Sequence, residues 1–163
     1  MSDPTEQNPP STTAAREGLG RHPRRRRILL VCVGNHIRSP IAAAVLAAHG
    51  GDDVVVRSAG LRYRHVGKGP HSNAVRAAAE RGYDIEDHIA VKVNFRLLEW
   101  ADTIVAMDHT VLNELQATAD EHAAPKLRLY LDGEDVHDPW EDAYPAFRTC
   151  VEVIERGAAR HLP

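Results

Sequence analysis

From Arg27 to the end of the chain, apolar and polar positions alternate between two patterns. Four runs are short, continuous and rich in Val, Ile and Leu, which is typical of strands buried on both faces. They are residues 27–33, 53–60, 101–108 and 125–133. The segments between and after these runs carry apolar residues at helical spacing and predict helices. These segments are residues 39–51, 72–83, 93–100, 109–119 and 142–162.

The residues at the segment ends support these boundaries. Ser39 is expected to cap the first helix, and Pro40 suits the first turn, where a proline gives up no intrahelical hydrogen bond. Gly50 and Gly51 should end this helix, and Gly82 should end the next one.

Strands that are separated by helices pair in parallel through right-handed crossovers. The order of segments therefore predicts an α/β fold, a three-layer α/β/α sandwich with a four-stranded parallel sheet. Ligands of such sheets bind beyond the carboxyl ends of the strands. Cys32 lies at the end of the first predicted strand, so the topology places it where a site is expected.

The chain has 163 residues, 43% hydrophobic and 26% charged, as expected for one globular domain. Residues 1–24 are rich in Pro, Ser, Thr and Gly, so we expect a disordered N-terminal arm, with a basic run that continues to Arg27. Residues 25–163 would form the folded domain. The formal charge of -3 gives no case for nucleic-acid binding, and we expect a monomer or a weak dimer.

Cys32 and Cys150 are the only cysteines, which is too few for a disulfide framework. The basic run and the six apolar residues 28–33 resemble the start of a signal peptide, but a signal requires about 7–15 apolar residues. No segment is long enough to cross a membrane. We therefore expect a cytoplasmic protein with reduced thiols and no membrane partner.

The segment VCVGNHIRSP, residues 31–40, has the composition of an anion-binding loop. It places Cys32 and Arg38 at the two ends of a strand-to-helix turn. Such a turn aims backbone N–H groups and the positive end of a helix dipole at one point, which favours the thiolate form of a cysteine there. A thiolate is a nucleophile, and the planar guanidinium of Arg38 matches two phosphate oxygens. The loop thus indicates covalent phosphoryl chemistry.

Other residues of this loop would support that chemistry. Gly34 permits close approach of the backbone, and Asn35 tolerates a left-handed conformation and can brace the loop through its amide. Ser39 can donate its hydroxyl to the sulfur. Val33, His36 and Ile37 complete the loop. Because a cysteine and an arginine at this spacing often occur by chance, the preceding strand and the Ser-Pro helix start strengthen the prediction.

Phosphoryl transfer also needs an acid that protonates the leaving oxygen. Asp138 in DVHDPW is the best candidate, because Pro139 favours extended backbone at the residue before it. It follows the fourth predicted strand, at the same edge of the sheet as Cys32. An ordinary turn before the last helix is the alternative for this Asp-Pro pair. Asp108, at the end of the third strand, is expected to brace the site rather than to react.

Together these motifs resemble the low-molecular-weight protein tyrosine phosphatases. The resemblance also includes RSAG (57–60), GKGPHSNAV (67–75), DHIAV (87–91) and ADTIVAMD (101–108). It implies a phosphatase domain over residues 25–163, acting by default on protein phosphotyrosine, with Cys32 as nucleophile, Arg38 as phosphate clamp and Asp138 as general acid. A cysteinyl-phosphate intermediate would follow, hydrolysed by water with Asp138 as base, and no cofactor or metal is implied.

Three positions depart from the family pattern. Ile37 stands where members often carry a second cysteine, so a protective disulfide with the nucleophile is absent. His36 stands where an apolar or small residue usually lines the pocket. It either bonds to backbone at the helix start or forms a polar wall that changes substrate choice. Trp140 and Glu141 follow the Asp-Pro pair, where eukaryotic members often have two tyrosines.

The segment LRYRHVGKGPH, residues 61–71, should form the rim of the pocket opposite Trp140. Its polar members include Arg62, Tyr63, Arg64, His65 and Lys68. A basic rim could read acidic residues around a phosphotyrosine, or hold a small phosphate ester such as a phosphorylated nucleoside, sugar or biosynthetic intermediate. A solvated loop without a binding role is the third possibility.

Two further classes share parts of this signature. Arsenate reductases have the same fold and loop but use additional cysteines, and Cys150 falls in an apolar helix segment where a structural thiol is expected. A module that binds phosphate without turnover would not need Cys32, Arg38 and Asp138 together. The ten histidines show no zinc-motif spacing, so no metal is expected.

Overall fold

The computed structural model describes residues 24–163. The prediction of a disordered arm over residues 1–24 therefore lies outside the described residues, except for Arg24. The guanidinium of Arg24 pairs with Asp102, and the basic residues Arg26 and Arg27 are already part of the first strand.

Four parallel strands form one sheet in the order β2-β1-β3-β4, which confirms the predicted sheet. The strands are β1 (Arg26–Cys32), β2 (Val54–Gly60), β3 (Thr103–Ala106) and β4 (Leu127–Leu129). In the register, Ile28 of β1 lies beside Val56 of β2 and Thr103 of β3. β1 is thus a central strand, and its carboxyl end reaches the middle of the sheet edge.

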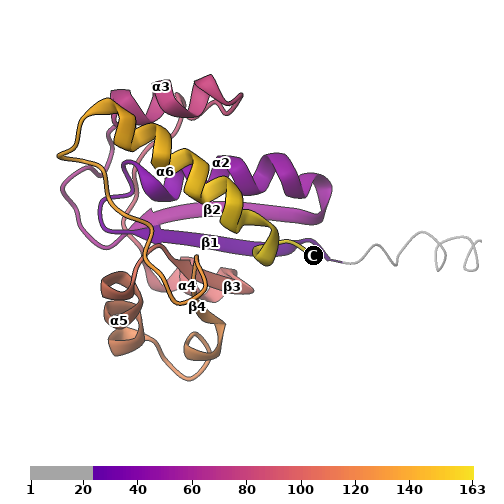
Figure 1. Cartoon of the computed structure of the whole chain (residues 1–163). Helices are drawn as coiled ribbons and strands as arrows, with labels where there is room; N and C mark the ends of the chain where they lie inside the picture. Colours follow the sequence, from indigo (N-terminus) through magenta and orange to yellow (C-terminus); the bar gives the residue numbers. More distant parts are fainter. Residues whose placement is uncertain (1–23) are drawn as a thin grey trace, which may run out of the picture.

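Helices cover both faces of the sheet, which completes the predicted three-layer sandwich (Figure 1). One face carries α2 (Arg38–Gly50), α3 (Ser72–Glu80) and α6 (Tyr144–Gly157). The other face carries α4 (Phe95–Trp100) and α5 (His109–Thr118). Short 3-10 turns span Gly51–Asp53, Ala124–Lys126 and Ala158–His161. No helix within residues 24–163 is long and apolar enough to cross a membrane.

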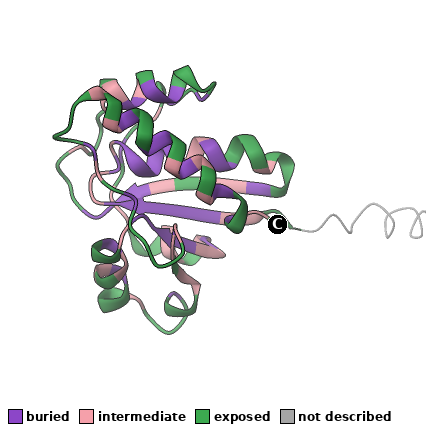
Figure 2. Cartoon of the chain, viewed as in Figure 1, coloured by how far each residue is buried: buried purple, intermediate pink, exposed green. Residues whose placement is uncertain are grey.

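The continuous apolar run of β1 follows from burial on both faces (Figure 2). Ile28 and Leu30 pack into the core under α2 and α6, whereas Leu29 and Val31 pack into the core under α4 and α5. Two cores therefore fix the same strand from opposite sides. This arrangement holds Cys32, the last residue of β1, in a defined position.

The structure corrects the predicted end of the fourth strand and the predicted cap of the first helix, and it confirms the end of the second helix. β4 has three residues rather than nine. After it, the Tyr130 N–H donates to the Ala106 carbonyl of β3 at 2.9 Å, and the buried Tyr130 hydroxyl donates to the Ile154 carbonyl of α6 at 2.5 Å. Gly82 ends α3 as predicted: it follows the cap residue Arg81 with a φ of 87°, and its N–H donates to the Ala79 carbonyl at 3.0 Å. Ser39 does not cap α2; the cap position is Ile37, and Ser39 lies in the first turn.

Candidate active site

The turn between β1 and α2 forms the floor of a cavity of about 680 Å³ at the carboxyl edge of the sheet. The turn is called the phosphate loop below and comprises residues 32–38. Six of the seven loop residues line this cavity. The rest of the lining comes from the segment 61–71 and from Asp138 and Trp140. The lining residues are Cys32, Val33, Gly34, His36, Ile37, Arg38, Arg62, Tyr63, Arg64, His65, His71, Asp138 and Trp140.

The phosphate loop turns its carbonyl groups outward. Four of its carbonyl oxygens accept hydrogen bonds from outside the loop. The donors Leu61 N, Arg62 N, His88 Nε2 and His71 N reach the oxygens of Cys32, Val33, Asn35 and His36 at 2.9–3.1 Å. Within residues 24–163, the amides of Gly34, His36 and Ile37 donate to no acceptor. Free amides on one side of a turn form a nest for an anion.

Asn35 holds the loop in this shape. Its φ of 52° is left-handed, as its residue type allows. Its Nδ2 donates to the hydroxyls of Ser39 and Ser58 at 2.8 and 2.9 Å, and its Oδ1 accepts the Val91 N–H at 2.9 Å. Gly60 permits this packing, because a Cβ there would lie 2.8 Å from the Asn35 nitrogen.

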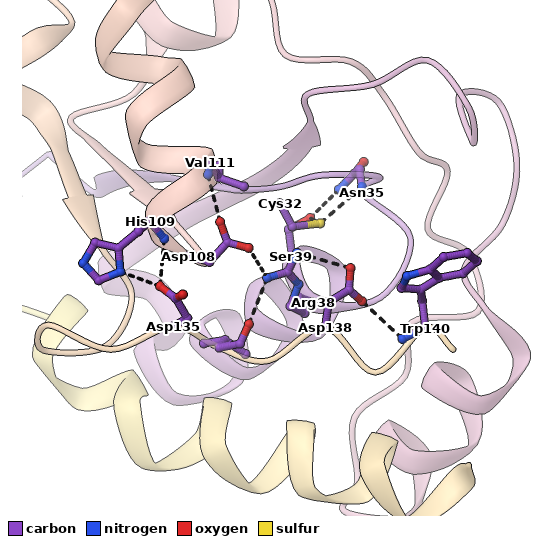
Figure 3. Close-up of polar contacts among 11 residues, drawn as sticks. Cys32, Asn35, Arg38, Ser39, Asp108, His109, Val111, Asp135, Asp138 and Trp140 are labelled. Atoms are coloured by element: carbon purple, nitrogen blue, oxygen red, sulfur yellow. Dashed lines mark hydrogen bonds and ion pairs between the residues drawn. The ribbon is translucent and has the colours of Figure 1, made fainter. Parts of the chain in front are cut away.

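Two polar groups contact the sulfur of Cys32 (Figure 3). The Asn35 N–H donates to Sγ at 3.2 Å, and the Ser39 hydroxyl lies 3.0 Å from Sγ. The Ser39 oxygen accepts from Asn35 Nδ2, and its own hydrogen can be donated to the sulfur at 3.0 Å or to the more distant Ala59 carbonyl at 3.5 Å. Both contacts stabilise a negatively charged sulfur over a neutral one.

Arg38 lies between two carboxylates (Figure 3). Its Nη1 donates to Asp108 Oδ2 at 2.7 Å and to the Val136 carbonyl at 2.9 Å, and its Nη2 lies 3.4 Å from Asp138 Oδ2. Burial alone would lower the pKa of Arg38, but the negative charges of Cys32, Asp108 and Asp138 outweigh burial and raise it. The guanidinium is therefore a fixed, permanent positive charge on the cavity wall.

Asp108 has the bracing position that the sequence suggested. Besides the bond to Arg38, its Oδ1 accepts the Val111 N–H at 2.8 Å and so caps α5. One carboxylate thus ties the start of a helix to the guanidinium. It does not line the cavity, whereas Arg38 does.

Asp138 reaches the cavity from the segment that follows β4. The Val136 N–H donates to the Met107 carbonyl at 2.8 Å, which anchors this segment to the end of β3. Asp138 Oδ1 accepts the Trp140 N–H at 3.3 Å, while 36% of the side chain stays exposed. A partly exposed carboxyl that faces Arg38 can exchange protons with both a bound group and water.

The rim of the cavity contains the predicted aromatic and basic side chains. The guanidinium of Arg64 lies 5.3 Å from the ring centre of Trp140, so the two walls of the mouth meet. Tyr63 is exposed, and Lys92 approaches its ring at 5.0 Å. All three predicted rim residues, Tyr63, Arg64 and Trp140, line the same cavity as Cys32.

His36 lines the cavity, as the polar-wall alternative expected, and its ring also bonds to the Gly69 backbone, in line with the other alternative. Its ring stacks on His65 with 3.9 Å between centroids, and its buried Nδ1 has no hydrogen-bond partner within residues 24–163. Burial, followed by repulsion from His65 and His71, lowers the pKa of His36 to about 4. No group of three or more His, Cys, Asp or Glu suited to a metal ion occurs in the described part of the chain.

Some residues of the site were not singled out from the sequence. Ser58 and His88 lie in segments used for the resemblance, but their bonds to the side chain and carbonyl of Asn35 had no local signal. His71 lies in the rim segment, and its place in the cavity wall was also missed. Cys150 is buried in α6, where burial raises the pKa of its thiol to about 12.

Comparisons with known proteins agree on one family. Residues 27–162 match the family model described as low molecular weight phosphotyrosine protein phosphatase. The probable low molecular weight protein-tyrosine-phosphatase EpsP of Ralstonia nicotianae is 34% identical over 137 residues, which cover 83% of this chain and 93% of that protein. The low molecular weight protein-tyrosine-phosphatase Wzb of Escherichia coli K12 is 34% identical over 134 residues, covering 80% and 89%.

Solved structures agree with the sequence comparisons. Vibrio vulnificus Wzb in complex with benzylphosphonate superposes with a TM-score of 0.78 at 29% sequence identity. The match covers 83% of this chain and 96% of that chain. The likeness therefore extends over nearly the whole relative.

Proposed function

Since this chain belongs to the low molecular weight phosphotyrosine protein phosphatases, a family of cysteine-based hydrolases, we propose a role for each residue of the cavity. Cys32 is the nucleophile, Arg38 the phosphate clamp and Asp138 the general acid. One observation carries this assignment. The sulfur lies among free loop amides and beside Ser39, with Arg38 on one side and Asp138 facing that arginine.

In the first step the Cys32 thiolate attacks phosphorus, and the bond from phosphorus to the leaving oxygen breaks. The leaving oxygen takes the proton of Asp138 as that bond breaks. Loop amides and Arg38 hold the equatorial oxygens, where negative charge is concentrated in the transition state. The products of this step are the free alcohol and a cysteinyl phosphate.

In the second step a water molecule attacks the cysteinyl phosphate, and the sulfur–phosphorus bond breaks. Asp138, now a carboxylate, takes a proton from that water. Its partial exposure leaves room for the water to approach. Sulfur leaves as a thiolate, and the Ser39 hydroxyl and the Asn35 N–H stabilise the returning charge. Inorganic phosphate is then released.

The family and its curated relatives are named for phosphotyrosine, so phosphotyrosine is the first candidate substrate. The exposed rings of Tyr63 and Trp140 at the mouth can flank an aryl phosphate. A small phosphate ester is the second candidate. The observation in its favour is the polar wall of His36 and His65, which suits a substrate more polar than a tyrosine ring.

A substrate panel tests this proposal. Phosphotyrosine peptides, phosphorylated sugars and phosphorylated nucleosides are compared by kcat/KM from phosphate release. We expect the peptides to be turned over and Cys32→Ser to abolish release from every ester. Equal or greater turnover of a sugar or nucleoside ester would establish the second candidate instead.

The same panel separates the two remaining classes. Arsenate-dependent oxidation of added thiols without phosphate release would indicate an arsenate reductase. Such an enzyme would need an external thiol, since Cys150 is the one other cysteine of the chain and is buried. Tight binding of phosphate esters without release would indicate a binding module. Either result would overturn the assignment of Cys32 as a turnover nucleophile.

We further propose that the protein works in the cytoplasm, as a monomer or a weak dimer, with phosphorylated substrate as its partner. The two cysteines are both free, and a nucleophilic thiol needs a reducing compartment. Nucleic acid and membranes are not proposed as partners. Light scattering at increasing concentration measures the oligomeric state.

A further inference from the structure

We propose that His36, His65 and His71 form a second anion subsite beside the phosphate loop, so that the preferred substrate carries a further negative group next to its phosphomonoester. The inference rests on the phosphatase function and narrows its substrate class. The chemistry that these residues recognise is a carboxylate or second phosphate within a few ångströms of the ester.

The three imidazoles meet in the wall of the cavity that contains Cys32. The rings of His36 and His65 are nearly parallel, at an angle of 3°, and the ring of His71 approaches His36 edge-on at 5.6 Å. A Cβ on Gly34 would lie 2.9 Å from His65 Cδ2, so His65 also packs on the phosphate loop. The His71 N–H bond to the His36 carbonyl, at 3.1 Å, joins the two segments.

The cluster has hydrogen-bonding capacity that the described protein does not fill. His71 Nδ1 accepts the Asn73 N–H at 3.0 Å, so in the neutral ring the hydrogen lies on Nε2. That Nε2 donates to no acceptor within residues 24–163. His36 Nδ1 is buried and likewise has no partner among these residues. A buried polar nitrogen is normally paired, so the unpaired His36 Nδ1, next to the half-buried His71 ring in the same cavity wall, points to a ligand group.

The histidines can gain charge when an anion binds. Burial first, then repulsion from neighbouring positive groups, lowers the pKa of His36 to about 4 and also lowers the pKa of His65. A nearby anion favours the protonated form and would raise both pKa values. Binding of a second negative group would therefore be accompanied by proton uptake.

The groups that surround the cluster favour an anion over a cation. Asp138 is the one carboxylate among the residues that line the cavity. The other charged or titratable groups near the three rings are Cys32, Arg38, Arg62, Tyr63, Arg64, Lys68 and His88. Arg62 is held at the rim by Glu114 through two hydrogen bonds of 2.8 and 2.6 Å. Most of these groups are positive, which complements a substrate with additional negative charge.

A metal ion does not fit this cluster. Two stacked rings 3.9 Å apart cannot both aim a nitrogen at one ion at the bond length of about 2.0–2.1 Å that zinc requires. The stacked geometry instead presents ring edges side by side along one wall. An extended anionic group can contact such edges together.

The test compares two esters that differ in one charge, 3-carboxyphenyl phosphate and the neutral 3-carbamoylphenyl phosphate. We expect the full chain to prefer the carboxylate in kcat/KM. The preference should grow as pH falls through the ordinary histidine range, by up to about tenfold per pH unit for one proton taken up. The preference for the carboxylate ester grows as pH falls because the histidine site keeps its proton to a higher pH when the anion is bound than when it is free. Ionisation of the phosphate affects both esters and cancels in the ratio.

Variants test whether the three histidines cause the preference for the carboxylate ester. His36→Leu and His65→Leu should bring the ratio of the two esters close to one at every pH, and His71→Asn, which keeps an acceptor at the start of α3, should reduce it. A general loss of activity cancels, because the ratio is taken within each variant. His122→Leu removes an exposed histidine that does not line the cavity, and it should keep the ratio of the original protein.

Calorimetry gives a second readout that needs no turnover. Binding of 3-carboxyphenyl phosphate to the Cys32→Ser protein, measured in two buffers of different ionisation heat, should show more proton uptake than binding of the carbamoyl ester. A pH-independent ratio near one, or a ratio that survives in the histidine variants, overturns the subsite but not the phosphatase function. Failure to hydrolyse either ester overturns the phosphatase function itself.

Peptides distinguish the source of the second anion. Phosphotyrosine peptides with Glu beside the phosphotyrosine are compared with the same peptides carrying Gln. A preference for Glu that disappears in His36→Leu supports an acidic phosphopeptide as the substrate. A preference confined to the free carboxylate ester supports a small metabolite with two anionic groups. Absence of a charge preference in both series overturns the subsite.

Discussion

Cys32 and Cys150 are almost equally buried, with 3% and 4% of their surface exposed, and both belong to the core under α2 and α6, yet their polar contacts differ. The sulfur of Cys32 contacts the Asn35 N–H and the Ser39 hydroxyl at the edge of a cavity. Cys150 lies on α6 in the apolar core, where burial raises the pKa of its thiol to about 12. Exposure therefore does not distinguish the two thiols; their polar neighbours do.

Replacing each cysteine by serine should give the largest difference in activity between two variants. Cys32→Ser is expected to lower kcat for aryl phosphates by on the order of 10⁴-fold or more, because the hydroxyl is a far weaker nucleophile here. Cys150→Ser should keep kcat and lower the free energy of unfolding by about 1–3 kcal/mol, because a hydroxyl is buried among apolar groups. Phosphate release and denaturant unfolding measure the two effects. Equal losses of activity in both variants would contradict the comparison.

Asp138→Asn should give the next largest effect. Loss of the acid is expected to lower kcat by about 10²–10⁴-fold for a poor leaving group such as an alkyl alcohol. The loss should be smaller for nitrophenol, which leaves without a proton. Asp142→Asn is the matched control, since its carboxylate pairs with His137 and does not line the cavity. Identical losses for both leaving groups would remove Asp138 from the role of acid.

Asp108→Asn tests whether Arg38 must be held in place. We expect kcat/KM to fall about 10–100-fold, since a hydrogen bond to a charged group contributes about 1.5–3 kcal/mol. The amide still caps α5, so the free energy of unfolding should change little through the cap. Asp108→Ala loses the cap as well and should cost about 1 kcal/mol more in unfolding. If both variants keep full activity, the fixed position of Arg38 is not required.

Ser39→Ala should give the smallest effect. Removing one neutral donor to the sulfur costs about 0.5–1.5 kcal/mol, which corresponds to about 2–10-fold in the rate of the step that releases the thiolate. Burst kinetics with a nitrophenyl ester separate this step from the first one. Ser72→Ala, an exposed serine at the start of α3, should leave both steps unchanged. A change confined to the first step would argue against stabilisation of the departing sulfur.

The strands and helices were predictable where burial on both faces or on one helix face determines the pattern. The apolar run of β1 is an example, since both cores pack on it. The bond from Tyr130 to the carbonyl of Ile154 was not predictable, because it is a contact across the fold. Ser39 has the residue type of a helix cap, but Asn35 and Cys32 occupy its hydroxyl instead.

The site was predictable to the extent that its residues are neighbours in the sequence or follow the ends of strands. Cys32 and Arg38 satisfy the first condition, and Asp138 satisfies the second. Ser58 and His88 support Asn35 from 23 and 53 positions away, and no local pattern indicates such bonds. The stack of His36 on His65 depends on the path of the rim segment, which the sequence alone does not determine.

α6 runs away from the cavity, and the chain finishes beside the first residues of β1 (Figure 1). There Arg26 Nη1 donates to the His161 carbonyl at 3.0 Å. A tag, a fluorophore or a solid support joined after Pro163 would therefore leave the molecule at the far end of the sheet from Cys32. A protein tethered through this end would still present its mouth to a large phosphorylated partner in solution.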